Sequence, residues 1–233
     1  MTFSNELVNF DALRRKAYNF RWAEVPEGVL PLTAADPDFP VAPEVIGAIQ
    51  DYLADGYLPY TPKLGLPEFR EAVAKAFRER KHEPVDAAMV LPMDSAARGM
   101  YLIAQTVLKP GDEAIVFDPV DFLFQNAVRS AGGVPVYFPA RVVDGRVDLH
   151  ELPKYLTPKT RMICLCNPHN PLGRLYTREQ LDFLLQVAEE HDLYIMNDEI
   201  WSDIVFDGGE FVSILSLGAE RNRKTLSVYG FSK

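Results

Sequence analysis

From residue 88 onward, short apolar runs alternate with longer stretches in which apolar residues recur at helical spacing. The clearest helix follows Thr177 and Gln180, which form a capping-box pattern ahead of an apolar stripe. The run MICLC at residues 162–166 is almost wholly apolar, as is typical of strands buried on both faces. We therefore expect helices over residues 96–108, 122–132, 148–156 and 177–192, and strands over residues 88–93, 113–118, 133–140, 161–166, 193–198 and 224–231.

The first part of the chain has a different pattern. Prolines recur through residues 24–45 and interrupt both helical and ladder hydrogen bonding. Apolar spacing predicts helices over residues 43–53 and 67–81. We interpret residues 1–45 as an N-terminal arm or small-domain segment and residues 46–233 as a large domain. Its alternating strands and helices predict an α/β fold, a three-layer αβα sandwich with a mostly parallel sheet.

Composition narrows the choice of partners. The net charge is −9 with no concentrated basic stretch, which argues against nucleic acid and anionic membranes. No apolar run approaches the roughly 20 residues that span a bilayer, and the N-terminus lacks a signal-like pattern. Cys164 and Cys166 lie two residues apart in a predicted strand, so their side chains point to one face. We interpret them as small core residues rather than as a disulfide or a zinc site. We therefore expect a cytoplasmic protein without a metal.

Polar residues follow several of the predicted strands at the point where each strand ends. In a parallel sheet the ligand binds beyond these carboxyl ends. Taken singly, each residue has an ordinary alternative, such as a turn asparagine, an N-cap aspartate or a surface lysine. Four segments place such residues at one edge: Asp94, Ser95 and Ala96; Asn167, His169, Asn170 and Arg174; Asp198, Glu199 and Trp201; Ser232 and Lys233.

An amide, a carboxylate, a lysine and a helix N-terminus together suit pyridoxal 5′-phosphate. A lysine can form a Schiff base with its aldehyde, and a carboxylate can keep its pyridine nitrogen protonated. An amide can donate to its phenolate oxygen, and a helix N-terminus can hold its phosphate. The chain has no dinucleotide-binding or nucleoside-triphosphate loop that would indicate a different ligand.

Several motifs in this order carry a resemblance to a known family: YTPKLGLPEFREAV, KPGDEAIVFDP, NPHNPLG, DEIW and GFSK. The sequence resembles the fold type I pyridoxal phosphate enzymes, specifically the class I/II aminotransferases and their cystathionine β-lyase-like (MalY/PatB) relatives. The resemblance implies a homodimer that acts on an amino acid and a 2-oxo acid.

The resemblance also implies a role for individual residues. Lys233 resembles the Schiff-base lysine, and Asp198 resembles the carboxylate that pairs with the pyridine nitrogen. Asn170 matches the residue that contacts the phenolate oxygen. Ala96 and Ala97 match the residues whose backbone amides bind the phosphate. Tyr60 matches the tyrosine that reaches the phosphate from the neighbouring subunit of a dimer.

The sequence departs from the family at several of these positions. Asp121 stands where an aromatic residue would stack on the cofactor ring, so either Phe122 replaces it or stacking is lost. Trp201 stands where many members have a tyrosine that donates to the phenolate oxygen. Gly230 replaces a phosphate-binding serine, and Ser232 either binds phosphate or caps the turn.

The family continues beyond its lysine with a phosphate-binding arginine and a C-terminal small domain, which carries the arginine that clamps the substrate carboxylate. Neither is present in these 233 residues. We expect either that the natural polypeptide continues beyond Lys233 or that the sequence stops at a modified lysine. Three arginines are possible anion ligands, with solvated surface charges as the ordinary alternative: Arg21, Arg98 and Arg174.

Three functions remain open at this point. The leading hypothesis is an aminotransferase, and the second is a carbon–sulfur β-lyase, which the segments AADPDFP and NPHNPLGR favour. The third is a non-catalytic or truncated fragment that binds the cofactor. The sequence does not indicate which amino acid is the substrate or which group binds its carboxylate.

Overall fold

The computed structural model describes residues 4–206 and 208–232, and these divide into two units. One unit takes in the described residues up to Thr61 together with Ser232, and the other is Pro62–Phe231. The sequence-based boundary at residue 45 stays a prediction.

The N-terminal unit contains short helical segments and one longer helix. Trp22 is buried, and its ring N–H donates to Asp38 Oδ1 at 2.7 Å. Arg21 is not a solvated surface charge, because its guanidinium pairs with Asp38 and donates to the Asp36 carbonyl at 3.1 Å. The predicted helix over residues 43–53 is confirmed, with Pro43 in its first turn. The elements are η1 (Asn5–Leu7), η2 (Ala12–Lys16), α1 (Phe20–Ala23) and α2 (Pro43–Ala54).

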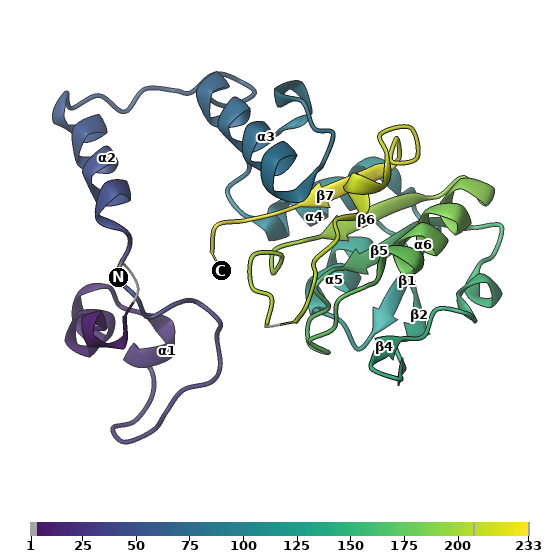
Figure 1. Ribbon diagram of the computed structural model, residues 1–233, viewed down its shortest axis with the longest axis horizontal. Coiled ribbons are helices and arrows are strands. Elements are labelled where there is room, and N and C mark those ends of the chain that lie inside the picture. Colours follow the sequence, from purple (N-terminus) through teal and green to yellow (C-terminus); the bar gives the residue numbers. More distant parts are fainter. Residues whose placement is uncertain (1–3, 207, 233) are drawn as a thin grey trace. The chain divides into compact units, whose positions relative to one another are not determined.

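The larger unit is built on a five-stranded sheet in the order β2-β1-β5-β6-β7, in which every neighbouring pair is parallel (Figure 1). Its strands are β1 (Glu113–Asp118), β2 (Val134–Pro139), β5 (Thr160–Cys166), β6 (Tyr194–Asp198) and β7 (Thr225–Val228). Its helical elements are α3 (Pro67–Lys81), η3 (Ala87–Met89), α4 (Ala96–Val107), α5 (Phe122–Ser130), η4 (Leu152–Tyr155), α6 (Arg178–Glu190) and η5 (Ile214–Leu217).

Alternating residues of the central strands enter two separate cores. In β5, Ile163 and Leu165 pack with the apolar stripe of α6. Met162, Cys164 and Cys166 point to the opposite face and pack with α4 and α5. Helices therefore cover both faces of the sheet, and the predicted three-layer α/β fold is confirmed. The two cysteines are buried free thiols in one core, as their spacing predicted.

Two local predictions were wrong, and one element was not predicted. Residues 88–93 form no strand: η3 takes up the first two of them, and Pro92 cannot donate to a ladder. The predicted helix over residues 148–156 shrinks to the 3-10 turn η4. A hairpin of β3 (Val142–Val143) and β4 (Arg146–Val147) was missed, although an Asp-Gly pair with positive φ forms its turn.

Candidate active site

The carboxyl ends of three neighbouring strands lie side by side. Cys166 at the end of β5 pairs with Asp198 at the end of β6, which pairs with Val228 at the end of β7. The Asn167 N–H donates to the Asp198 carbonyl at 2.9 Å, so the pairing continues past the end of β5. The segments that carry Asn170 and Asp198 therefore leave one edge of the sheet. Lys233 lies outside the described residues, so its position stays a prediction.

Asp198 is buried on the face of the sheet that α4 covers. By strand alternation its side chain shares that face with Met196, which belongs to the α4 core. Its Oδ1 accepts a hydrogen bond from the Ile200 N–H at 2.9 Å. Burial raises the pKa of the neighbouring Cys166 thiol, and the Asp198 carboxylate raises it further. Asp198 thus stands at a low-dielectric strand end, where a cationic ring nitrogen would be well matched.

Helix α4 brings its first turn close to the same strand ends. A Cβ on Gly99 would lie 2.9 Å from Cγ1 of Val228, so glycine lets the helix pack closely on β7. Ser95 caps the helix by accepting from the Arg98 N–H at 3.1 Å. The N–H groups of Ala96 and Ala97 meet no acceptor among the described residues. These two donors and the helix dipole form an anion-binding end.

Asn170 is bonded to Asp121 across two loops. Its Nδ2 donates to Asp121 Oδ2 at 3.1 Å, and its carbonyl accepts from the Asp121 N–H at 3.1 Å. Asp121 also caps α5, because its Oδ1 accepts from the Leu123 N–H at 3.0 Å. Phe122 is the first residue of α5, and its side chain is exposed.

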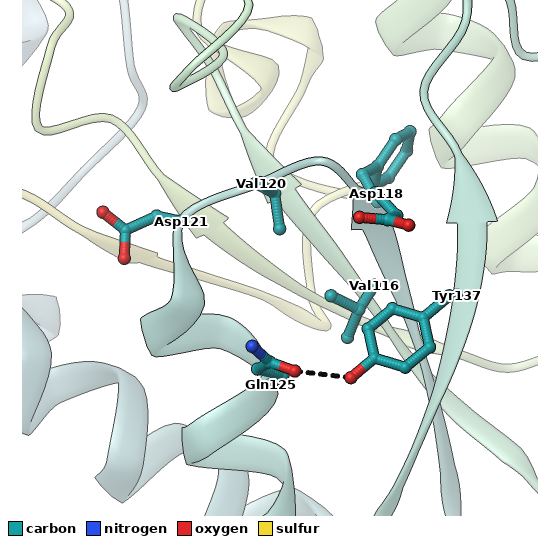
Figure 2. Close-up of a pocket in the computed structure, with 7 residues that line it drawn as sticks. Val116, Asp118, Val120, Asp121, Gln125 and Tyr137 are labelled. Carbon is teal, nitrogen blue, oxygen red and sulfur yellow. Dashed lines mark hydrogen bonds between the residues drawn. The ribbon is translucent and has the colours of Figure 1, made fainter.

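A cavity of about 260 Å³ opens beside this loop, at the ends of β1 and β2. Gln125 and Tyr137 are hydrogen-bonded to each other on its wall, and Figure 2 shows the Asp121 carboxylate turned away from both of them. Asp121 also lines this cavity, and its carboxylate is hydrogen-bonded to Asn170 Nδ2.

The buried residue His169 joins the same two loops. Because a carbonyl can only accept, its Nε2–H donates to the Pro119 carbonyl at 2.8 Å. Its Nδ1 then accepts from the Tyr176 hydroxyl at 2.8 Å. Burial lowers the pKa of His169, which keeps the ring neutral in this arrangement. The sequence placed His169 at the strand end but gave no sign of these partners.

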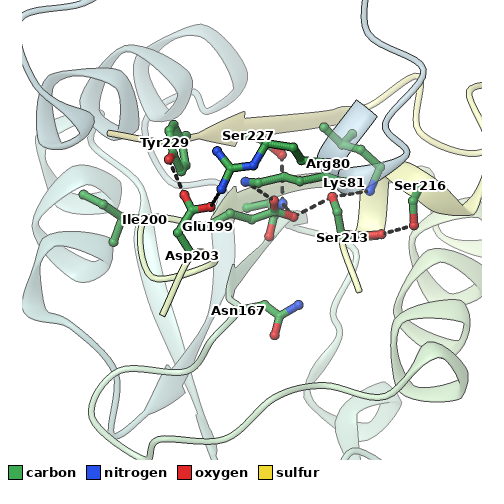
Figure 3. Close-up of polar contacts among 12 residues, drawn as sticks. Arg80, Lys81, Asn167, Glu199, Ile200, Asp203, Ser213, Ser216, Ser227 and Tyr229 are labelled. Carbon is green, nitrogen blue, oxygen red and sulfur yellow. Dashed lines mark hydrogen bonds and ion pairs between the residues drawn. The ribbon is translucent and has the colours of Figure 1, made fainter. Parts of the chain in front are cut away.

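A second polar cluster surrounds Glu199, the residue after Asp198 (Figure 3). Glu199 Oε1 accepts from Asn197 Nδ2 at 2.9 Å and from Ser213 Oγ at 2.7 Å. Its Oε2 pairs with Lys81 Nζ at 3.2 Å, and both side chains are almost fully buried. Burial, and then the charge of Glu199, raise the pKa of the nearby Glu83 to about 8. Sequence reasoning missed Lys81 and Glu83 altogether.

The remaining predicted residues are less closely grouped. Trp201 is half-buried in the turn that follows β6. Tyr60 and Ser232 belong to the N-terminal unit, where both are exposed. The side chains of Arg98 and Arg174 are exposed, and Arg98 lies 3.7 Å from Asp94. The roles assigned to these residues stay predictions.

The described donors fit pyridoxal phosphate. A buried carboxylate, an oriented amide and a helix end with two unused N–H groups all belong to the strand ends of one parallel sheet. Each matches one polar part of the cofactor: the ring nitrogen, the ring oxygen and the phosphate. Fold and site together define the class of the fold type I pyridoxal phosphate enzymes.

Comparison with known proteins places the chain within that class. Residues 27–233 match the sequence model of the family described as aminotransferase class I and II, and the chain belongs to this family. Pyridoxal 5′-phosphate is the cofactor that this membership assigns to it.

Individual relatives give the same result. The chain is 35% identical over 203 residues to the probable aspartate/prephenate aminotransferase of Thermus aquaticus. The matched region covers 87% of this chain and 52% of that protein. It superposes with a TM-score of 0.84 and 30% identity on the aromatic aminotransferase of Pyrococcus horikoshii, covering 90% of the chain and 56% of that structure. The chain thus spans about half the length of the curated relatives it matches.

Cystalysin from Treponema denticola, whose structure contains a pyridoxal 5′-phosphate cofactor, superposes with a TM-score of 0.82. This likeness covers 99% of the chain and 58% of that structure, and at 24% identity it shows the shared fold alone. Within the described residues, no helix combines the length and apolar character that a bilayer crossing requires.

Proposed function

We propose that the protein is a pyridoxal phosphate-dependent aminotransferase that moves an amino group between an L-amino acid and a 2-oxo acid. The observation that carries the proposal is the position of Asp198. This buried carboxylate stands at the end of β6, on the face of the sheet where the first turn of α4 offers two unused N–H groups. The names of the relatives make aspartate and aromatic amino acids the first substrates to test.

When bound, pyridoxal phosphate supplies an electron sink for the charge that develops on the α-carbon of the amino acid. Asp198 would hold a proton on the ring nitrogen, because a buried carboxylate favours a cation beside it. Asn170 would donate to the ring oxygen, and the N–H groups of Ala96 and Ala97 would hold the phosphate. Lys233 would bind the cofactor and move the proton, a role that rests on the sequence alone.

Absorption spectroscopy tests this proposal. Added pyridoxal phosphate should give the visible band of a cofactor bound to a lysine, and the Lys233→Ala variant should lack it. Amino acids added one at a time should change the band, and a 2-oxo acid should restore it. A protein without the lysine-dependent band would not be an enzyme of this kind, and a band that no amino acid changes would indicate a non-catalytic binding module.

Membership in the MalY/PatB-like branch, and with it β-lyase activity, is the second candidate. It is supported by the segments AADPDFP and NPHNPLGR. Release of pyruvate and ammonia from cystathionine, without a requirement for a 2-oxo acid, would favour the lyase. A turnover that depends on the 2-oxo acid would favour the aminotransferase.

We also propose a cytoplasmic homodimer in which Tyr60 reaches the phosphate site of the partner subunit. The two free thiols support the cytoplasmic location. The full exposure of the Tyr60 side chain supports its contact with a partner subunit. Mixing Tyr60→Ala subunits with Lys233→Ala subunits tests it, because only a mixed dimer then contains one site with both native residues. Recovery of activity on mixing is the expected result, and sedimentation of a monomer would contradict it.

A further inference from the structure

Asp121 occupies the position at which the family resemblance places an aromatic residue that stacks on the cofactor ring. Asp121 makes hydrogen bonds within the protein instead. Both carboxylate oxygens are engaged: Oδ1 accepts from the Leu123 N–H, and Oδ2 accepts from Asn170 Nδ2. The Asp121 N–H also donates to the Asn170 carbonyl. Asp121 is therefore hydrogen-bonded to Asn170 both through its side chain and through its backbone N–H.

We propose that Asp121 is a positioning residue that orients the Asn170 amide toward the cofactor, an inference that rests on the proposed function. An ionised carboxylate has no proton to donate, so it can be paired only with the NH₂ group of the amide. This pairing decides which way the amide faces. One N–H is held by Asp121, and the second N–H is left in a fixed direction for the ring oxygen of the cofactor.

The surroundings of this pair resist rearrangement. His169, the residue before Asn170, is hydrogen-bonded to the Pro119 carbonyl in the loop that carries Asp121. It is also hydrogen-bonded to the Tyr176 hydroxyl, seven residues further along the chain. The Asn170 N–H faces Cys166 Sγ at 3.5 Å, at the end of β5. The backbone on both sides of the carboxylate–amide bond is therefore held in place. The bond itself involves a charged acceptor, which makes it stronger than a neutral pair.

The bond between Asp121 and Asn170 should also strengthen cofactor binding. An asparagine free to rotate would lose side-chain freedom when the cofactor binds, whereas one already held by Asp121 has little left to lose. An aromatic residue at this position would contact the cofactor ring directly. Asp121 instead preorganises the polar contact that Asn170 makes with the cofactor. Its effect on cofactor binding must then pass through Asn170.

A double-mutant cycle in the full-length protein tests this. Asp121→Ser keeps an oxygen for the Leu123 N–H and removes the one that accepts from Asn170. Asp118→Ser is the matched control, since Asp118 is an exposed residue three positions earlier and the two bonds between the loops are made by Asp121 and Asn170. The measurements are the dissociation constant of pyridoxal phosphate, the melting temperature without cofactor, and the side-chain amide signal of Asn170 by NMR.

We expect Asp121→Ser to raise the dissociation constant up to about tenfold, the factor that corresponds to the cost of immobilising one side chain on binding. Asn170→Ala should raise it at least as much, and the double variant should be no weaker than Asn170→Ala alone. Asp118→Ser should stay within about twofold of the wild type, well below that tenfold factor. The Asn170 amide signal should move in Asp121→Ser and not in Asp118→Ser.

Three results would overturn the inference. These are an Asp121→Ser affinity equal to that of the wild type, effects of the two substitutions that multiply, and an unchanged amide signal. If Asp121→Ser fails to fold, Asp121→Asn serves the same test, because it keeps the size and one capping oxygen but not the second acceptor. A wild-type protein that binds no pyridoxal phosphate would overturn the proposed function as well, whereas normal wild-type binding with an unaffected variant overturns this inference alone.

Discussion

Asp198 and Glu199 are adjacent buried carboxylates with contrasting surroundings. Asp198 lies on the α4 face of the sheet, near a helix end whose first N–H groups have no acceptor among the described residues. Glu199 points the other way, where three side chains from α3, β6 and the segment before η5 bond its two oxygens. Glu199 is bonded to Asn197, whose side chain alternates along β6 with those of Met196 and Asp198 and so lies on the opposite face.

Under our proposal, one fold gives two roles to the same chemical group. A carboxylate whose oxygens all have protein partners joins secondary structure elements and has no capacity left for a ligand. We propose that Asp198, near the first turn of α4, instead serves a ligand that carries both a cation and an anion. Substitutions in the Glu199 cluster should therefore change stability, whereas substitution of Asp198 should change cofactor binding.

The largest expected effect is on stability, from Lys81→Met. Methionine keeps an apolar stem near Phe77 and Tyr229, whose rings Lys81 Nζ approaches to 4.6 and 4.3 Å, but removes the charge. Glu199 would then be buried without its cation, which costs about 3–5 kcal/mol of unfolding free energy. Urea unfolding without cofactor measures this.

Arg80→Met is the matched control for Lys81→Met. Arg80 is the preceding residue and pairs with Asp203 at 2.7 Å, but its side chain is exposed. An exposed pair contributes at most about 1 kcal/mol. Equal losses from the two substitutions would show that burial of the Glu199 cluster does not determine its energy.

Asp198→Asn should have the largest effect on binding. The amide keeps an oxygen for the Ile200 N–H but has no charge for a ring nitrogen. Loss of one charge-assisted hydrogen bond raises the dissociation constant of pyridoxal phosphate about 10–100-fold, while the unfolding free energy without cofactor falls by no more than about 1 kcal/mol. Glu199→Gln should give the reverse pattern. If both variants changed both quantities equally, the two carboxylates would not have separate roles.

Glu83 gives the Glu199 cluster a pH dependence of predictable sign. Its pKa of about 8 in the folded protein lies above the ordinary value of 4.5, because of burial and then the charge of Glu199. The folded state therefore binds this proton more tightly than the unfolded chain. The stabilisation is complete below about pH 4.5 and is lost as the pH rises through about 8.

Wild-type protein and a Glu83→Gln variant, compared by urea unfolding from pH 5.5 to pH 8, isolate this contribution. Between pH 6 and pH 7, the unfolding free energy of the wild type should fall relative to the variant by up to about 1.4 kcal/mol. The charged groups that face Glu83 are Glu199 and Lys81, and both are present in the two proteins. Parallel curves would contradict the raised pKa.

The sequence predicted the sheet well because its strands are apolar on both faces. Alternate residues such as Ile163 and Cys164 enter different cores, and only a strand covered on both sides has this pattern. Residues 88–93 are similarly apolar but form no strand, because an apolar pattern predicts burial and not hydrogen-bond partners. The β3–β4 hairpin had a signal in Asp144 and Gly145, but its strands are too short for a periodic pattern.

The candidate site was predictable where residues follow strands directly. Asp198 ends β6 and Asn170 follows β5, so the rule that ligands bind at carboxyl ends found both. Partners distant in the sequence were not predictable. Lys81 meets Glu199 across 118 residues and His169 meets Pro119 across 50, and no local pattern records such a pairing. The same holds for Asp121: its residue type indicated either replacement by Phe122 or a loss of stacking, but not its bond to Asn170.

The smallest expected effect comes from Ser213→Ala. The Ser213 hydroxyl donates to Glu199 Oε1 and accepts from the Leu215 N–H, while Oε1 keeps its bond from Asn197. Because Glu199 stays paired with Lys81, the loss should be about 1 kcal/mol of unfolding free energy, the usual net contribution of one hydrogen bond. The dissociation constant of pyridoxal phosphate should not change. Weaker cofactor binding at unchanged stability would mean that the Glu199 cluster controls the geometry of Asp198, and that the two carboxylates act as one unit.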